Sequence, residues 1–316
     1  MRKTIIALVP LALMANFIGL RLTVGEANPV VYALMALPAP GWPMLFLLIA
    51  IFYVFKKKRI LALTYALSAI AIIFPLLNPS FGSPKVGRAK ALRMMTFNVQ
   101  KFQNFNPEQV AAAIRKENPD VVCLQEANMK APPNPLPKAF HAALPGYQIV
   151  QRGQTAILSK FPVTFGTAFA LRSGTDGRPA QMATIMVDGQ PISVTCVHIQ
   201  YFPWDGSISV AQASRNLMKE TQSLEDLVKE PGVPTIVAGD FNTLSHGRTH
   251  RMMRKYLTDS FSTTATGFGL TLPAVFPLKR LDYIYVGRGL KPLKCWVSNI
   301  IASDHRAVVA DLALEP

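Results

Sequence analysis

The chain has 316 residues, of which 50% are hydrophobic and only 16% are charged. This composition excludes a disordered chain and is too apolar for a typical soluble enzyme. The net charge of +15 does not by itself indicate nucleic-acid binding, because residues 1–89 hold nine basic residues and one acidic residue. Three cysteines without CxxC or CxxH spacing exclude a disulfide scaffold and give no zinc motif.

Three apolar runs occupy the first 80 residues, and each is close to the roughly 20 residues that a helix needs to cross a bilayer. They cover residues 4–20, 36–55 and 60–77. We therefore expect residues 1–80 to form an integral membrane anchor of about three transmembrane helices. Arg2 and Lys3 precede the first run, and Lys56–Arg59 separate the second from the third, which places both basic clusters in the cytoplasm.

This topology predicts that the rest of the chain lies on the periplasmic or extracellular side of a bacterial inner or plasma membrane. Membrane lipids are then partners of the N-terminal helices, and the sequence indicates no obligate protein partner. An alternative for residues 1–25 is a cleaved signal peptide, since a basic start followed by an apolar stretch fits one. The two later runs anchor the domain under either interpretation.

Residues 81–91 contain Gly, Pro and Ser with scattered cations, and predict a linker. Beyond them, short strands alternate with two helices. Asn106 and Pro107 are typical of a helix start, and a second helix is expected over residues 209–229. Asp188 and Gly189 predict a hairpin turn. Strands are predicted at 93–99, 120–124, 155–158, 182–187, 192–198, 235–238, 281–286 and 307–312.

The predicted strands are too numerous for a helical bundle, and hairpins interrupt them too often for a purely parallel sheet. We therefore predict an α+β fold for residues 92–316, with two mixed sheets packed face to face and helices outside. The domain boundaries that follow are an anchor over 1–80, a linker over 81–91 and a catalytic domain over 92–316.

Side chains that can bind metal or phosphate recur at the ends of the predicted strands. Because strand ends on one edge of a sandwich converge, these residues are expected to share one cavity. They are Asn98, Glu126, His198, Asp240, Asn242, Asp282, Asp304 and His305.

The segments around these residues together resemble the endonuclease/exonuclease/phosphatase superfamily of metal-dependent phosphoesterases. The matching stretches, in the family's order, are MTFNVQ, DVVCLQEAN, ILSKFPV, VTCVHIQ, VAGDFNT, RLDYIYV and SDHRAVVADL. Each stretch alone is weak evidence, whereas seven in sequence are specific. The resemblance covers residues 92–314 and implies a DNase I-like four-layer α/β sandwich.

The resemblance also implies a divalent cation, Mg²⁺ with Mn²⁺ as the alternative. Glu126 is expected to be a ligand, because a hard cation prefers oxygen ligands and usually keeps waters beside one or two carboxylates. Asn98 would add a side-chain oxygen, and Asp304 would contribute to the same site or to a second one. The structural alternatives are a salt-bridged strand end for Glu126 and a turn cap for Asn98.

The catalytic roles implied by the resemblance are those of in-line water attack on a phosphoester. Asp240 would orient or deprotonate the water, with Asn242 holding the water and the phosphate. His305 and His198 would contact phosphate oxygens from opposite sides, and Asp282 would fix the tautomer of His305. The alternatives are an Asx-turn for the Asp240 loop and purely structural histidines.

Three residues are predicted to contact the substrate. Arg178 resembles a position from which the family presents a phosphate-binding cation, and Tyr201 and Trp204 follow His198 in an aromatic-rich loop. That loop could meet lipid headgroups, stack on bases or pack on the rim of the sandwich.

Three functions remain open. The first is a membrane-anchored phosphodiesterase that acts on lipid headgroups or other extracytoplasmic phosphoesters. The second is an anchored endonuclease or exonuclease that degrades extracytoplasmic DNA or RNA. The third is a binding module without activity, which the full set of polar residues disfavours. Gln100, where DNA-repair members of the family carry Asp, favours the first function over a repair enzyme.

Overall fold

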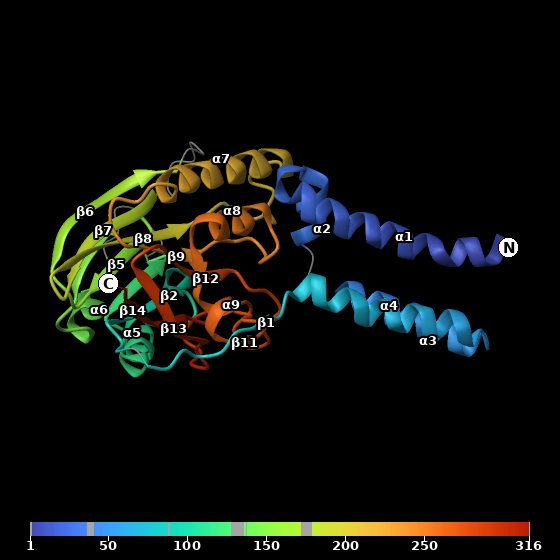
Figure 1. Cartoon of the computed structure of the whole chain (residues 1–316), viewed down its shortest axis with the longest axis horizontal. Helices are drawn as coiled ribbons and strands as arrows, with labels where there is room; N and C mark the ends of the chain where they lie inside the picture. Colours follow the sequence, from blue (N-terminus) through green and yellow to red (C-terminus); the bar gives the residue numbers. More distant parts are fainter. Residues whose placement is uncertain are drawn as a thin grey trace.

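The computed structural model describes residues 2–36, 41–87, 89–127, 136, 138–171 and 179–315. Two six-stranded mixed sheets pack face to face in the body of the molecule, and helices cover their outer faces (Figure 1). The first sheet has the order β10-β12-β9-β8-β7-β6 and the second has the order β13-β14-β2-β3-β5-β4. The predicted α+β class with two packed mixed sheets is therefore confirmed.

Each sheet contains one parallel pair of strands, and its other neighbouring strands are antiparallel. The parallel pair is β8 with β9 in the first sheet and β2 with β3 in the second. The strands of the first sheet are β6 (Val163–Ala170), β7 (Pro179–Val187), β8 (Gln190–His198), β9 (Thr235–Asp240), β10 (Thr258–Asp259) and β12 (Asp282–Val286). Those of the second sheet are β2 (Leu92–Asn98), β3 (Val121–Gln125), β4 (Gln148–Arg152), β5 (Thr155–Ser159), β13 (Leu290–Val297) and β14 (Val308–Leu314).

The helices of the body lie outside the two sheets. Apolar side chains of α5 and α6 pack on the second sheet, and those of α7 and α8 pack on the first. The short elements are η2 (Gln100–Phe102), α9 (Ser260–Thr264), β1 (Ser80–Phe81) and β11 (Thr266–Gly267). The longer helices are α5 (Pro107–Glu117), α6 (Lys138–Ala143), α7 (Val210–Val228) and α8 (Arg248–Tyr256).

Local signals in the sequence account for several of these elements. Asn106 accepts a hydrogen bond from the backbone of Gln109 while the Gln109 side chain accepts one from the backbone of Asn106, so the predicted helix start is a capping box. Asp188 and Gly189 both have positive φ and connect β7 to β8, as the hairpin prediction requires. The sequence missed β4, β6 and β13. These three strands end their sheets, where exposed positions weaken the apolar pattern.

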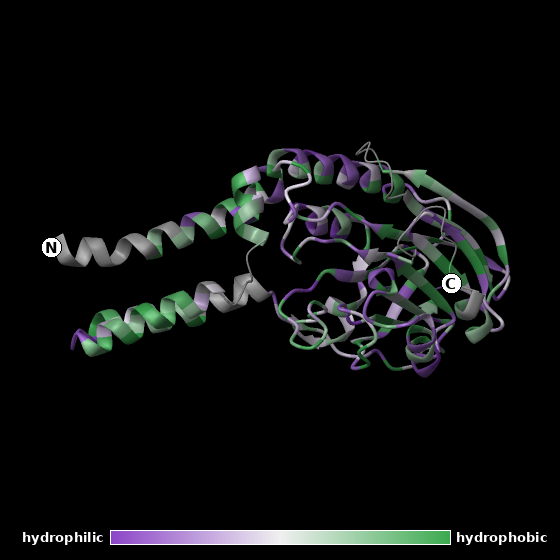
Figure 2. Cartoon of the chain, turned by 180° about the vertical axis from the view of Figure 1, so that it is seen from behind, coloured by the Kyte–Doolittle hydropathy of each residue, from purple (hydrophilic) through white to green (hydrophobic). Residues whose placement is uncertain are grey.

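The helices α1 (Arg2–Thr23), α3 (Gly41–Phe55) and α4 (Arg59–Leu77) project away from the sandwich (Figure 1). The short η1 (Gly25–Ala27) and α2 (Pro29–Ala36) lie where the projecting helices meet the sandwich, and both contact α7. Much of α3 and the first half of α4 is strongly hydrophobic (Figure 2), and many of their apolar side chains are exposed, including Phe55 and Ile60.

Among the described residues, no helix combines the length and the apolar character that crossing a bilayer requires. This finding corrects the prediction of three transmembrane helices. The second apolar run was expected to give one helix over 36–55, whereas α2 ends at Ala36 and α3 begins only at Gly41. With 15 residues, α3 rises about 22 Å, which is less than the ~30 Å of a hydrocarbon core.

The predicted linker runs along the surface of the sandwich. Within it, β1 pairs with β11, and the backbone N–H groups of Lys85 and Ala91 donate to the carbonyls of Leu293 and Leu312. The segment that joins α4 to β2 is thus tied to the catalytic domain by main-chain hydrogen bonds.

Candidate active site

The polar residues at the strand ends converge because the two central parallel pairs end at the same edge of the sandwich. In the second sheet Asn98 lies beside Gln125, and Glu126 follows directly. In the first sheet His198 lies beside Asp240, which also pairs with Asp282 on β12.

Asp240 is the centre of the site. Its carboxylate is 1% exposed, and Oδ2 accepts a hydrogen bond from Nδ2 of Asn98 at 3.0 Å. The Nε2 atoms of His198 and His305 each lie 3.8 Å from the same oxygen. Asn98 Nδ2 also lies 3.4 Å from Oε1 of Glu126, so a single amide joins the two carboxylates.

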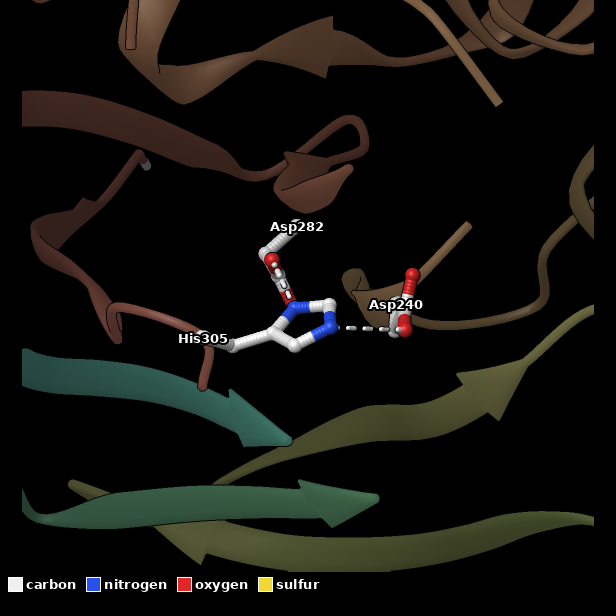
Figure 3. A group of neighbouring side chains, drawn as sticks. All are labelled: Asp240, Asp282 and His305. Atoms are coloured by element: carbon white, nitrogen blue, oxygen red, sulfur yellow. Dashed lines mark hydrogen bonds and ion pairs between the residues drawn. The ribbon is translucent and has the colours of Figure 1, made fainter. Parts of the chain in front are cut away.

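His305 is held by a buried carboxylate. Its Nδ1 donates to Oδ2 of Asp282 at 2.8 Å, while Nε2 faces Asp240 (Figure 3). Burial by itself lowers the pKa of His305, but the charges of Asp282 and Asp240 outweigh it and raise this pKa to about 10. The imidazole is therefore cationic at neutral pH, with its orientation fixed by Asp282.

Burial has the opposite effect on the Asp240 carboxyl. Desolvation raises its pKa to about 7, the charge of His305 opposes the rise, and the nearby Asp282 carboxylate adds to it. A carboxyl group with a pKa near neutrality is suited to accept a proton during a reaction at pH 7. The environment thus gives Asp240 the acid–base property that its predicted role needs.

Asn242 is placed by a tight turn directly after β9. Its backbone N–H donates to Oδ1 of Asp240 at 2.8 Å, and its side-chain Nδ2 donates to the carbonyl of Ile199 at 3.2 Å. The residue has a φ of +47°, a conformation that Asn tolerates better than most residues. The Asp240 side chain therefore forms the Asx-turn that was the structural alternative, and Asp240 and Asn242 nevertheless line the cavity.

The donor set fits a divalent cation. Asp240, Asp282 and His305 each offer a ligand atom within 4.8 Å of the others. Asp282 and His305 are engaged with each other, whereas Glu126 is partly exposed and lines the cavity. Glu126 is thus the carboxylate best placed to hold a hard cation, which prefers oxygen ligands, and Asp240 beside it remains the proton acceptor.

Two predicted residues stand apart from this group. The Asp304 side chain accepts from Ser303 Oγ at 3.1 Å and is absent from the cavity lining among the described residues, although its charge helps to raise the pKa of His305. Its role as a ligand stays a prediction. Arg178 lies outside the described residues.

Asn98 was expected to offer its side-chain oxygen to the cation. That oxygen accepts a hydrogen bond from the backbone N–H of Gln100 at 3.0 Å, and the NH₂ group of the same side chain faces the carboxylates of Asp240 and Glu126.

A cavity of about 360 Å³ opens onto the site. Tyr201 and Trp204, the two aromatic residues expected to contact substrate, both line it. The sequence did not indicate that the N-terminal segment, which was assigned to the anchor, adjoins this aromatic loop and also lines the cavity. The lining residues not predicted include Glu26, Tyr32, Met35, Lys101 and Lys279.

Comparison with known proteins identifies relatives of the catalytic domain. The model of the endonuclease/exonuclease/phosphatase family matches residues 95–305. The uncharacterized protein YbhP of Escherichia coli K12 is 27% identical over 259 residues, which cover 71% of this chain and 97% of that protein.

Solved structures share the fold. A mannosyl-6-phosphatase of Bacteroides thetaiotaomicron is 17% identical, with a TM-score of 0.57 over 71% of this chain and 100% of its own. The D. rerio TDP2 in complex with a single-strand DNA product is 15% identical, with a TM-score of 0.55 over 70% of this chain and 98% of its own. These likenesses show that the fold is shared.

Proposed function

The chain belongs to the endonuclease/exonuclease/phosphatase family, and we propose that it is a divalent-metal-dependent hydrolase of phosphodiesters. Membership of the family makes it a phosphoesterase. The preference for diesters, the requirement for metal and the identity of the metal, Mg²⁺ or Mn²⁺, are the parts proposed.

One observation carries the proposal. Asp240 Oδ2 lies within 3.8 Å of an amide and two imidazoles, and one of those imidazoles is held cationic by a buried carboxylate. Such a group offers a proton acceptor and positive charge around one point. Hydrolysis of a phosphoester by water needs both, because a proton leaves the nucleophile while negative charge gathers on the phosphoryl oxygens.

A cation held by Glu126 and its neighbours would supply charge stabilisation at a non-bridging oxygen and at the leaving oxygen. The protein's own residues perform the remaining steps. Asp240 takes a proton from water as the water oxygen bonds to phosphorus, with Asn242 holding the water in line. The bond from phosphorus to the leaving oxygen breaks, and that oxygen is protonated from solvent. His198 and His305 donate hydrogen bonds to the phosphoryl oxygens, and Asp282 keeps His305 in position.

The test uses bis-(p-nitrophenyl) phosphate as the diester and p-nitrophenyl phosphate as the monoester, each with Mg²⁺, with Mn²⁺ and with EDTA. We expect metal-dependent release of p-nitrophenol from the diester. His198→Gln should lower kcat by at least ~10²-fold, in line with the loss of one stabilising donor. His141→Gln, at an exposed position on α6, is the matched control and should leave kcat unchanged. Undiminished hydrolysis in EDTA, or hydrolysis of the monoester alone, would overturn the proposal.

We also propose that the chain acts at a membrane surface. The exposed apolar side chains of α3 and α4, such as Phe55 and Ile60, support association with lipid. Flotation of the full chain with vesicles in a density gradient tests this part independently of activity, and recovery of all protein in the lipid-free fraction would overturn it.

A further inference from the structure

The helix α2 forms one wall of the catalytic cavity, although it lies about 60 positions before the region that the family model matches. Tyr32 and Met35 line the cavity from one face of α2, and Phe202 and Trp204 line it from the loop after β8. The Tyr32 and Phe202 rings meet edge to face at 5.2 Å, and the rings of Phe202 and Trp204 lie 4.6 Å apart. The cavity is therefore closed on one side by an apolar wall built from two distant segments.

Buried polar contacts fix this wall to the catalytic domain. The carboxylate of Glu26, which is 1% exposed, accepts from the backbone N–H of Arg248 at the start of α8 at 2.5 Å. Ser214 Oγ on α7 donates to the carbonyl of Glu26 at 2.6 Å. A side chain at position 247 would clash with the Glu26 carboxylate, so Gly247 permits this close approach. At the other end of α2, Lys279 Nζ donates to the carbonyl of Ala36 at 2.8 Å.

The cavity consequently has two chemically distinct ends, and the charged groups that reach its apolar side, Glu26 and Lys279, are engaged with the backbone of Arg248 and of Ala36. Glu126, His198, Asp240 and His305 form the polar end, where the phosphoryl group reacts. A substrate whose phosphate carries only a small polar alcohol would gain little binding free energy at the apolar end. Burial of apolar surface is favourable in proportion to the apolar area that both partners remove from water.

A second cavity of about 450 Å³ lies on an adjacent face of α2, between α2 and the projecting helices α1 and α3. Its lining is almost entirely apolar, and Val31 and Leu34 contribute to it one helical turn apart. The rest of the lining comes from Met14, Asn16, Phe17, Leu20, Val30, Leu45, Phe46 and Ile49. Apolar surface thus continues beyond the wall of the catalytic cavity and toward the projecting helices.

From this arrangement we infer that the substrate is an amphiphilic phosphodiester, with a long apolar group esterified to the phosphate that reacts at Asp240. The inference rests on the proposed phosphodiesterase activity and names its substrate class. Tyr32 and Met35 of α2, together with Phe202 and Trp204, are the specificity-determining residues. The apolar group can come from a lipid within a bilayer or from a free amphiphile, and the shared chemistry is a phosphodiester with an alkyl or acyl chain.

The test compares methyl p-nitrophenyl phosphate with octyl p-nitrophenyl phosphate, the latter below its aggregation concentration. Both esters release p-nitrophenolate, so their reacting bond is the same. We expect kcat/KM to be at least ten times higher for the octyl ester, and Met35→Ser to reduce that ratio toward one. Met35→Leu should restore most of the ratio. Ala33→Ser, on the same helix but outside both cavity linings among the described residues, is the matched control and should keep it.

Failure of this inference differs from failure of the proposed function. Equal kcat/KM for the two esters, or faster cleavage of single-stranded DNA than of either ester, would overturn the amphiphile inference while leaving a phosphodiesterase. Absence of hydrolysis of both esters with Mg²⁺ and with Mn²⁺ would overturn the proposed function itself. A parallel assay on phospholipid vesicles separates the sources: release of headgroups from vesicles supports a bilayer lipid, and cleavage of the monomeric octyl ester alone supports a free amphiphile.

Discussion

Replacing Asp240 with Asn should abolish most of the activity and yet increase the stability of the folded protein. The substitution preserves the size of the side chain and removes its charge. A general base contributes roughly 10²–10⁴-fold to rate, so we expect kcat to fall by a factor in that range. Stability should rise while activity falls, because the Asp240 carboxylate is buried and the folded protein disfavours its negative charge.

The magnitude follows from the pKa. Burial raises the pKa of Asp240 from 3.8 to about 7, roughly three units, at about 1.4 kcal/mol each. A raised pKa means that the group stabilises the fold at low pH and that this contribution is lost as pH rises through 7. At pH 8 the charge therefore destabilises the fold by about 4 kcal/mol. That value already includes the bond from Asn98. Asn removes the penalty, but its NH₂ group would face either the Asn98 amide or the backbone N–H of Asn242, and a buried donor left without an acceptor costs about 1–3 kcal/mol.

The net expectation is a gain of about 1–3 kcal/mol in the free energy of unfolding at pH 8, shrinking as the pH is lowered toward 5. Urea denaturation of EDTA-treated protein measures the stability, and the diester assay measures kcat. Asp188→Asn, in the exposed β7–β8 hairpin, is the matched control and should change neither. If Asp240→Asn lowered stability at pH 8 while activity fell, the loss of activity would reflect a damaged fold, and the reasoning above would be refuted.

Three further outcomes are expected. Glu126→Gln should raise the Mg²⁺ concentration needed for half-maximal activity by about tenfold or more, and a Mg²⁺ titration showing no shift would exclude Glu126 as a ligand. Burial lowers the pKa of His246 to about 3 and that of His250 well below 6.5. These two histidines therefore contribute stability above pH 6.5, and each loses up to about 1.4 kcal/mol of it per pH unit below, opposite in sign to the contributions of Asp240 and His305. Urea midpoints of the wild type and of His246→Gln at pH 7.5 and 5.5 isolate this sign: the variant should lose less stability, or gain more, on acidification than the wild type does, and an identical change in both would contradict it. Asp259→Ala should lower the free energy of unfolding by about 3–5 kcal/mol, because it leaves the buried Arg280 guanidinium, 2.6 Å away, without its carboxylate. A loss below 1 kcal/mol in denaturant titrations would show that water reaches Arg280.

Local sequence signals account for much of the catalytic domain. The apolar alternation located the central strands, the Asn106 capping box located α5, and Asp188-Gly189 located a hairpin. These features depend on contacts between residues that are close along the chain, and such contacts are recorded in short stretches of sequence. The order of polar residues at the strand ends also indicated the family, which the match over residues 95–305 confirms.

The N-terminal region shows where local signals mislead. Hydrophobicity alone assigned residues 1–80 to an anchor and gave Glu26 and Tyr32 no role. In the structure, Glu26 is buried against α8 and Tyr32 lines the cavity. An apolar side chain is equally consistent with contact to lipid, to a protein core or to a substrate cavity, so composition cannot choose among them.

The sequence by itself determined the central strands, one hairpin turn and the polar residues that end the strands, because each of these is set by the chemistry of a few neighbouring residues. Only the tertiary structure decided that Nε2 of both His198 and His305 lies 3.8 Å from Oδ2 of Asp240 and that α2 closes the cavity. These relations depend on strand register and helix docking, which join residues up to hundreds of positions apart and leave no periodic trace in the chain.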